Sequence, residues 1–466
     1  MATEGMNALG VVIAFDVGTT RLKWIVVEAA GGGVLWRGQE IIRAEQNGPA
    51  SEQNPEKIWT LMDAVLDKAR EYGPLERIAL SAAMHSMMAV DRAGRPLTQS
   101  WTWMDKRAQE VAERVRESAD GGALRRLTGV PVHSMSPLMK WLFVREKLPA
   151  DARPVALKDY LVYRLTGTWQ TDYSTASASG FLGLDGSWLQ QAVDLAQVDV
   201  STLPDLAPMT GRLKTRDRQS EVVIGGTDAA TAHHHLQIPA DGTLAVLAMG
   251  TSGAIRITSQ HPAEDAALFC YTMGPGAGYL VGAAFSNVGN TIQWLADLFG
   301  LAVDAVMERG LEAIRSGRKL PGALPYWQGE RSPWWQETLA GTWSDMGPQT
   351  TQADLAGSTI LAITASYWEG LRTLVGLGEP VQEIRAGSGL MANPAMGQWM
   401  ADALNRDIVL YDQRDASLLG ALDWALDHGP TPSGEVRRFS PQVNMEAHMA
   451  QEWARIESAV GGILAH

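Results

Sequence analysis

The sequence predicts an α/β protein that is built from two related halves. Apolar, β-branched runs alternate along the chain with segments of helical periodicity, which is the pattern of an α/β fold. Two similar strand–turn–strand segments lie about half a chain apart, which suggests an internal repeat. The length of 466 residues is enough for two or three domains with sizeable cores.

Each half opens with a predicted β-hairpin. The first covers residues 10–32, GVVIAFDVGTTRLKWIVVEAAGG, and the second covers residues 242–259, GTLAVLAMGTSGAIRITS. In both, two apolar runs flank a short turn, Gly18-Thr19-Thr20 in the first and Gly250-Thr251-Ser252 in the second. The similarity of the two turns is the main sign of the repeat.

A helix and a further strand follow the first hairpin. The helix is predicted over residues 54–73, where Asn54 can cap it, Pro55 suits its first position and Gly73 can end it. Its apolar stripe consists of Ile58, Leu61, Met62, Val65 and Leu66. Residues 77–86, RIALSAAMHS, then predict a buried strand that runs into a loop.

The second half closes with a predicted strand, glycine turn and helix over residues 383–410. Asn393 can cap this helix and Pro394 can begin it. Its apolar face consists of Met396, Trp399, Met400, Ala403 and Leu404. The proline and glycine in residues 238–242 suit a connector, so we place two domains at residues 1–240 and 241–466.

Composition excludes several classes of partner. The net charge is −13 and no long run carries one sign, which argues against a nucleic-acid or anionic-membrane surface, although a local pocket can still bind a small anion. The single cysteine, Cys270, allows no disulfide within the chain and fits the cytoplasm. The first ten residues do not resemble a signal peptide, and no run is long enough to span a bilayer. The sequence does not decide whether the chain forms a homodimer.

The two Gly-hydroxyl turns are candidate phosphate-binding loops. Glycine lets the backbone approach an anion closely, and successive N–H groups with threonine or serine hydroxyls supply donors. Neither turn is a Walker loop, and an ordinary hairpin turn is the competing interpretation. Asp16, just before the first turn, could orient Mg²⁺ through the water ligands of the ion.

The segment IGGTDAATAHHHL, residues 224–236, holds a candidate base. Asp228 falls in the first turn of a predicted helix, where the helix dipole favours an ionised carboxylate that could accept a proton from a hydroxyl. The competing interpretation is that Asp228 only caps the helix, with Thr227 as the rival cap. The consecutive residues His233–His235 splay about 100° apart around a helix, so they suit packing or exposure better than one shared metal ion.

Five motifs, taken together, resemble the FGGY family of carbohydrate kinases over nearly the whole chain. They are FDVGTT (residues 15–20), GGTDAA (225–230), AMGTSGAIR (248–256), PYWQGERSPWW (325–335) and AGSGLMANPAMGQWMADAL (386–404). Within the family the chain most resembles gluconokinases, through residues 81–108 and 157–181.

The resemblance implies two actin-like, ribonuclease-H-like domains with a catalytic cleft between them. It also implies transfer of the γ-phosphoryl group of ATP, with Mg²⁺, to a sugar or polyol hydroxyl, for which positioning and charge neutralisation are the main requirements. The implied residues are Gly18, Thr19, Thr20, Arg21, Gly250, Thr251 and Ser252 for phosphate, Gly387, Ser388, Gly389, Leu390 and Asn393 for adenosine, Asp16 for Mg²⁺, Asp228 as the base, and Met84, His85, Asp105 and Arg107 with Asp228 for the sugar.

The chain departs from the family pattern at several positions. Arg21 stands where small polar residues are common, and Gly387-Ser388-Gly389 replaces the usual three glycines. Lys140 is kept, whereas Phe143 replaces a tryptophan, and the histidine run replaces small residues on the helix after the base. These departures weaken the assignment of gluconate more than that of a kinase.

The substrate residues also have structural alternatives. Arg107 could bind the carboxylate of gluconate in a bidentate manner, or it could form an ion pair with Asp105. His85 could be a core histidine, and Trp101 or Trp103 could serve packing alone. Conversion of gluconate to 6-phosphogluconate is the leading hypothesis. A kinase for xylulose, glycerol or another polyol is the close rival, and a non-catalytic sugar or nucleotide sensor is the third.

Overall fold

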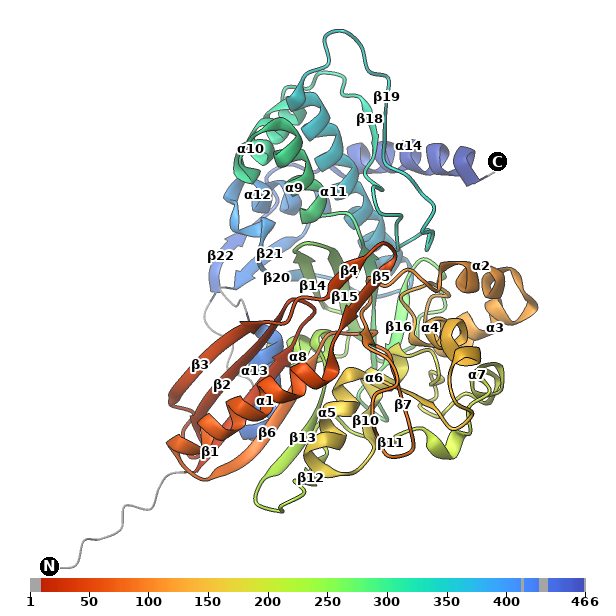
Figure 1. The fold of residues 1–466 in the computed structure, drawn as a ribbon. Helices are drawn as coiled ribbons and strands as arrows, with labels where there is room; N and C mark the ends of the chain where they lie inside the picture. Colours follow the sequence, from red (N-terminus) through yellow and green to blue (C-terminus); the bar gives the residue numbers. More distant parts are fainter. Residues whose placement is uncertain (1–9, 412–414, 427–434, 465–466) are drawn as a thin grey trace, which may run out of the picture. The chain divides into compact units, whose positions relative to one another are not determined.

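The computed structural model describes residues 10–411, 415–426 and 435–464. Contacts divide the chain into two units, each of which is described by itself (Figure 1). The first unit comprises Met1–Gln237, Tyr271–Tyr279 and Asp415–Pro432, and the second comprises Ile238–Cys270, Leu280–Arg414 and Ser433–His466. The first unit therefore includes two segments from the second half of the sequence.

The first unit is organised around a six-stranded sheet. In spatial order its strands are β12 (Arg212–Lys214), β13 (Glu221–Thr227), β6 (Leu75–Ala82), β1 (Val11–Val17), β2 (Arg21–Glu28) and β3 (Val34–Ile41). Strands β1, β6 and β13 are parallel neighbours, and β2 pairs with β1 in the predicted antiparallel hairpin.

The alternation of side chains along β1 divides the core of this unit into two layers. Val11, Ile13, Phe15 and Val17 pack with α1 (Pro55–Ala69) and α5 (Leu157–Thr166). Val12 and Ala14 point to the opposite face and pack with α13 (Ala416–Leu426). Helices thus cover both faces of the sheet (Figure 1). Asp16 shares the face of Val12 and Ala14, so its side chain is directed toward α13.

The predicted start of α1 is confirmed. The side chain of Asn54 accepts a hydrogen bond from the backbone N–H of Lys57, and Pro55 begins the helix. The apolar stripe faces the core, with Leu61 half-buried at its margin. A short 3-10 turn, Arg70–Tyr72, precedes Gly73, so the α-helix ends slightly earlier than predicted.

A seven-stranded sheet is formed mostly by residues of the second unit. In spatial order its strands are β16 (Phe269–Thr272), β17 (Tyr279–Phe285), β15 (Gly253–Ser259), β14 (Leu244–Met249), β20 (Glu383–Gly389), β21 (Asp407–Tyr411) and β22 (Glu435–Phe439). Along β15-β14-β20-β21-β22 the successive pairings are antiparallel, parallel, parallel and antiparallel. The order β2-β1-β6-β13-β12 has the same succession. The α/β class and the internal repeat are therefore confirmed.

The remaining elements lie around these two sheets. The other helices are α2 (Gln109–Glu117), α3 (Ala119–Thr128), α4 (Pro137–Val144), α6 (Tyr173–Ala178), α7 (Gln190–Ala196), α8 (Asp228–His235), α9 (Gly289–Phe299), α10 (Val303–Arg315), α11 (Gln352–Gly376), α12 (Pro394–Leu404) and α14 (Glu446–Leu464). The small sheets are β4 (Glu45–Asn47) with β5 (Ala50–Gln53) and β8 (Ser100–Trp101), β7 (Met88–Val90) with β9 (Arg153–Val155), β10 (Gln170–Asp172) with β11 (Asp205–Ala207), and β18 (Gly322–Leu324) with β19 (Thr342–Ser344).

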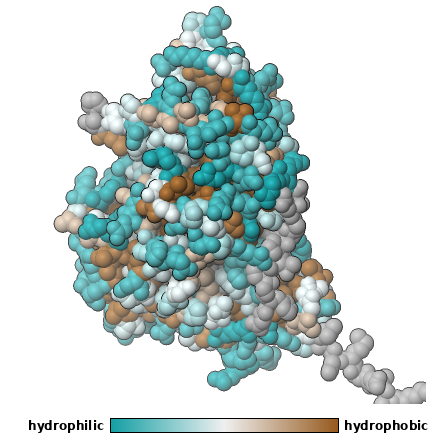
Figure 2. Space-filling model, turned by 180° about the vertical axis from the view of Figure 1, so that it is seen from behind, coloured by the Kyte–Doolittle hydropathy of each residue, from teal (hydrophilic) through white to brown (hydrophobic). Residues whose placement is uncertain are grey.

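The surface agrees with the composition. The face in Figure 2 is mostly hydrophilic, with hydrophobic residues scattered over it, as a chain of net charge −13 leads one to expect. Within the described ranges, none of the helices combines the length and the apolar character that crossing a bilayer requires.

Candidate active site

The candidate residues of the first unit follow the carboxyl ends of parallel strands. The turn Gly18-Thr19-Thr20 follows β1, Met84 and His85 follow β6, and Asp228 follows β13. Because these three strands are parallel neighbours, their carboxyl ends lie at one edge of the sheet. In open α/β sheets this edge is where ligands usually bind. The fold therefore gathers residues that are 210 positions apart, from Gly18 to Asp228, at one edge.

Asp16 is a buried carboxylate at this edge. Its Oδ2 accepts a hydrogen bond of 2.9 Å from the hydroxyl of Ser417 on α13, whereas its buried Oδ1 accepts none from the described residues. Burial, followed by the negative charge of Asp228, raises the pKa of Asp16 to about 6. The two carboxylates thus influence each other, and a buried oxygen without a donor fits a site where a hard cation such as Mg²⁺ would bind.

Asp228 is not the cap of its helix. Thr227 is the N-cap of α8, and its hydroxyl accepts from the N–H of Ala230. Asp228 takes the next position, is partly exposed, and accepts a hydrogen bond of 2.9 Å from the N–H of Ala229. Its carboxylate lies in the positive end of the helix dipole, which favours the ionised form. Because Thr227 caps the helix, capping does not account for an aspartate at position 228.

The first Gly-hydroxyl turn is fixed by a residue that sequence reasoning missed. The N–H of Gly18 donates to the carbonyl of Arg21 at 2.9 Å, which closes the turn. The buried amide of Gln53 donates to the carbonyls of Gly18 and Thr19, both at 3.1 Å, and to that of Ile42. With its carbonyls occupied in this way, the turn is held in one conformation. Arg21 begins β2, and its side chain is exposed.

His85 adopts an unusual backbone conformation that a buried lysine holds in place. Its φ angle is +63°, in the left-handed region that non-glycine residues rarely adopt. The ammonium group of Lys140 on α4 donates to the carbonyls of His85 and Thr102, both at 2.7 Å. Burial lowers the pKa of Lys140 to about 7. Lys140 thus connects the loop that contains His85 with the loop that begins at Thr102. These two loops hold the candidate sugar residues.

The ring of His85 has two further partners. Nδ1 lies 3.0 Å from the carbonyl of Ala178, and Nε2 lies 3.3 Å from the hydroxyl of Tyr271. Tyr271 comes from the segment Tyr271–Tyr279, which belongs to the first unit although it lies far along the sequence. A tyrosine in an apolar strand gives no sequence signal of such a placement, so Tyr271 could not be predicted.

Arg107 forms the ion pair that was the structural alternative. Its guanidinium donates to both carboxylate oxygens of Asp105, at 2.6 to 3.1 Å, and to Glu52 at 2.6 Å. It also stacks on the ring of Trp101, 3.7 Å from the ring centroid. The bonds use Nε and Nη2, whereas Nη1 makes none of them. Asp105 is fully buried and also accepts from the N–H of Ser51, so β5 links this pair to Gln53.

For the sugar and ATP that the resemblance implies as substrates, replacing Lys140 by methionine is expected to raise the KM for the sugar about tenfold and to leave the KM for ATP unchanged. The change removes this donor from the buried carbonyl of Thr102 and the partly buried carbonyl of His85, and the loss of a donor to a buried group costs about 1–3 kcal/mol. Steady-state kinetics with each substrate varied in turn will measure this. Lys147→Met, which removes an exposed lysine just after the same helix, is the matched control. An unchanged sugar KM in Lys140→Met would show that Lys140 does not position the sugar loops.

The second unit places the other two turns at one edge of its sheet. The turn Gly250-Thr251-Ser252 follows β14, and Met249 pairs with Gly389 at the end of the parallel strand β20. At Gly389, where φ is +90°, a Cβ would lie 2.5 Å from the carbonyl oxygen of Met249. The N–H groups of Gly289 and Asn290, at the start of α9, donate to the carbonyls of Gly250 and Thr251. The second candidate phosphate turn and the candidate adenosine segment are therefore neighbours.

The candidate adenosine segment differs in one respect from the prediction. Gly387, Ser388 and Gly389 form the end of β20 rather than a turn, because Gly389 still pairs with β14, and the chain turns from Leu390 onward. Asn393 caps α12, as predicted, through bonds from the N–H groups of Ala395 and Met396. Its amide donates to Asp304 at 3.0 Å, so both ends of this side chain have protein partners.

His234 and His235 of α8 contact α13. His233 and His235 are buried, and Nδ1 of His235 lies 2.6 Å from Oδ2 of Asp423. The ring of His234 lies 4.9 Å from that of Trp424, and burial lowers the pKa of His234. The described residues contain no group of three or more potential metal ligands. The contacts with Trp424 and Asp423 show that His234 and His235 serve the packing of α8 on α13.

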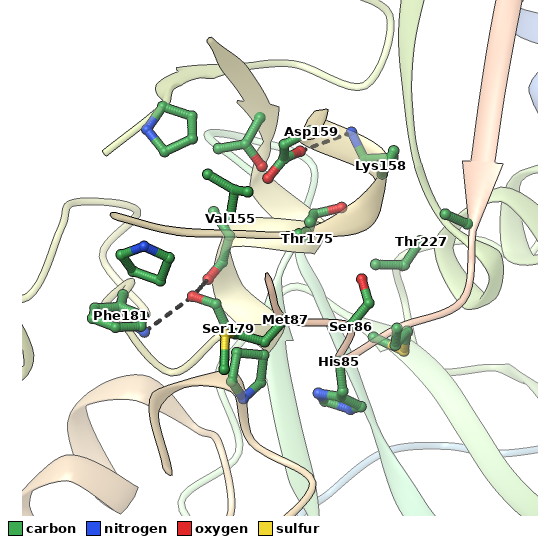
Figure 3. Close-up of a pocket in the computed structure, with 18 of the residues that line it drawn as sticks. His85, Ser86, Met87, Val155, Lys158, Asp159, Thr175, Ser179, Phe181 and Thr227 are labelled. Atoms are coloured by element: carbon green, nitrogen blue, oxygen red, sulfur yellow. Dashed lines mark hydrogen bonds and ion pairs between the residues drawn. The ribbon is translucent and has the colours of Figure 1, made fainter. Parts of the chain in front are cut away.

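A small pocket lies beside the candidate sugar residues. Met84, His85, Lys158, Asp159 and Thr227 are among the residues that line it. Lys158 and Asp159 lie at one end and His85 at another, with Thr227 to one side (Figure 3). Its volume of about 40 Å³ suits a water molecule, not a sugar.

Comparison with known proteins agrees with this arrangement. Models of the N-terminal and C-terminal domains of the FGGY family of carbohydrate kinases match residues 11–228 and 245–426. Gluconokinase of Bacillus subtilis is 26% identical over 88% of this chain and 86% of its own. Two crystal structures from Lactobacillus acidophilus, of a gluconate kinase and of a ligand-bound xylulose kinase, both have TM-scores of 0.88 at 21% identity. They cover 98% of this chain, and 98% and 99% of their own.

Proposed function

The chain belongs to the FGGY family of carbohydrate kinases, and from this premise we propose that it transfers the γ-phosphoryl group of ATP to gluconate, giving 6-phosphogluconate. The observation that carries the kinase assignment is the group at the edge of the first sheet. Asp228 stands there at the start of a helix that another residue caps. Asp16 influences its charge, and a Gly-hydroxyl turn follows β1, which is separated from β13 by β6 alone.

Under this proposal, Asp228 accepts the proton of the attacking hydroxyl. A carboxylate in the first turn of a helix is available in its ionised form, as a base requires. The turns at Gly18 and Gly250 each offer backbone and hydroxyl donors to the phosphates of ATP, and residues 387–390 and 393 serve the adenosine. Because the transition state is mainly a problem of charge and alignment, fixed donors of this kind can supply much of the catalysis.

We also propose that Asp16 holds Mg²⁺. The buried Oδ1 of Asp16 accepts no hydrogen bond from the described residues, and Asp228 adds a second carboxylate to the negative charge there. Mg²⁺, when bound, neutralises charge on the transferred phosphoryl group. Arg21 is the nearest cation in the sequence to the first turn, and we assign it to the phosphates.

Gluconate is proposed as the acceptor on two grounds. A gluconokinase is among the relatives with the highest identity, and Arg107 keeps Nη1 for a carboxylate while its other donors are used. Met84, His85 and Asp105 are proposed to bind the hydroxyls. A specific observation favours a second candidate, a kinase for a neutral polyol such as xylulose. Asp105 and Glu52 already balance the charge of Arg107, so the site has less attraction for an anion.

A substrate screen tests the choice of sugar. ADP release is measured with gluconate, xylulose, ribulose, glycerol and erythritol, and we expect the highest kcat/KM with gluconate. Strong turnover of a neutral polyol with none of gluconate would rule out gluconate and leave the kinase assignment in place. Binding of a sugar without turnover of any would instead favour a sensor.

A further inference from the structure

The first unit buries a charged cluster that the proposed reaction does not use. Lys158 on α5 is 1% exposed, and its Nζ lies 3.0 Å from Oδ2 of Asp172 and 3.4 Å from Oδ1 of Asp159. All three side chains are buried. Burial raises the pKa of Asp159 to about 6, whereas the two carboxylates raise the pKa of Lys158. Buried charges are costly unless they are paired, so such a cluster calls for an explanation.

A chain of hydrogen bonds joins this cluster to the start of α8. Asp172 caps α6 and accepts from the N–H of Ser174, at 2.8 Å, and from its hydroxyl. The hydroxyl of Ser174 in turn accepts from the N–H of Thr227 at 3.1 Å, and it lies 3.2 Å from the hydroxyl of Thr227. Lys158 itself donates to the carbonyl of Ile224 at 3.3 Å. The cluster therefore holds β13 on both sides of Gly225 and Gly226.

This stretch of β13 requires support from outside. The pairing of β13 with β6 shifts register between Val223 and Gly226, and Gly225 has a φ of +69°. Because the ladder is interrupted here, contacts outside it help to fix the stretch: the N–H of Gly225 donates to the carbonyl of Met209 at 3.0 Å, and that of Thr227 donates to Ser174. Thr227 and Asp228 follow directly. The direction of the Asp228 carboxylate therefore depends on what fixes Thr227.

We propose that Lys158, Asp172 and Ser174 form a positioning network that fixes Thr227 and thereby orients Asp228 toward the attacking hydroxyl. They are positioning residues, because they act through Thr227. Lys158 and Thr227 line the pocket of Figure 3 together with Met84 and His85, so the network lies on the side of the candidate sugar residues. The proposal rests on the proposed function, because it assumes that Asp228 is the base.

Ser174→Ala is the primary test, because it removes one buried hydroxyl with little change in volume. We expect kcat to fall about 10- to 100-fold, since small misplacements of reacting groups have effects of this size. The KM values for sugar and ATP should stay within about twofold, because the binding residues are not changed. Ser220→Ala is the matched control. Ser220 is equally buried and donates to the carbonyl of Leu75 at the other end of β13, so its loss should leave kcat unchanged.

A double-mutant cycle with Asp228→Asn separates positioning from a general structural role. If the network acts through Asp228, Ser174→Ala should cause little further loss in the Asp228→Asn background, as measured with radiolabelled ATP. A full additional loss there, or a kcat for Ser174→Ala equal to that of Ser220→Ala, would overturn the proposal. If the wild-type protein turns over no sugar, both the proposed function and the network that rests on it would be overturned. Activity that is lost in Asp228→Asn but kept in Ser174→Ala would overturn the network alone.

Discussion

Replacing Asp228 by asparagine is expected to lower kcat by about 10²- to 10⁴-fold, the range that a positioned base contributes. The amide has nearly the shape of the carboxylate but cannot take the proton of the attacking hydroxyl. Thr227 caps α8 independently of position 228, so the helix should keep its start. The variant should therefore bind ATP with nearly unchanged affinity and unfold near the wild-type temperature.

Three measurements decide this prediction. Turnover is followed by ADP release, nucleotide affinity by calorimetry, and stability by thermal unfolding. Asp205→Asn, at an exposed position on β11 of the same unit, is the matched control and should behave as the wild type. Full activity in Asp228→Asn would remove this residue from the mechanism, and a loss of ATP binding would point to phosphate contact rather than base catalysis.

Much of the scaffold could be predicted, because it depends on local signals. The hairpin of residues 10–32 follows from two β-branched runs around a turn, and the start of α12 follows from Asn393 and Pro394. The similarity of the two turns, at Gly18 and Gly250, correctly indicated two sheets with the same succession of pairings. The hairpin and the helix start are each decided by residues that are close together in the sequence.

The partners of the candidate residues could not be predicted, because they depend on long-range packing. Periodicity gives α13 an apolar face but does not say which sheet it covers. As a result, the bond from Ser417 to Asp16, across 401 positions, leaves no sequence signal. Lys140 and Lys158 raise a second difficulty. Lysine is normally a surface residue, and only the fold shows that both are buried.

Gly225→Ala is expected to be the most destabilising single substitution considered for the first unit. Gly225 has a φ of +69°, and a Cβ there would lie 1.6 Å from the carbonyl oxygen of Leu80 on β6. That oxygen belongs to the central sheet and cannot move without disturbing the neighbouring strands. Strain at positive φ costs about 1 kcal/mol, and overpacking adds 1–3 kcal/mol or more, which gives a loss of about 4 kcal/mol. The midpoint of thermal unfolding should fall by roughly 10 °C.

Gly317→Ala separates the two causes of this effect. Gly317 has nearly the same φ, +68°, but a Cβ there meets nothing within 4 Å. This control therefore carries the backbone strain without the clash, and its midpoint should fall by only a few degrees. Equal shifts in the two variants would show that β13 can move away from β6. In that case, close packing of β13 on β6 would not explain the two glycines before Asp228. We would then infer that these glycines are needed for flexibility.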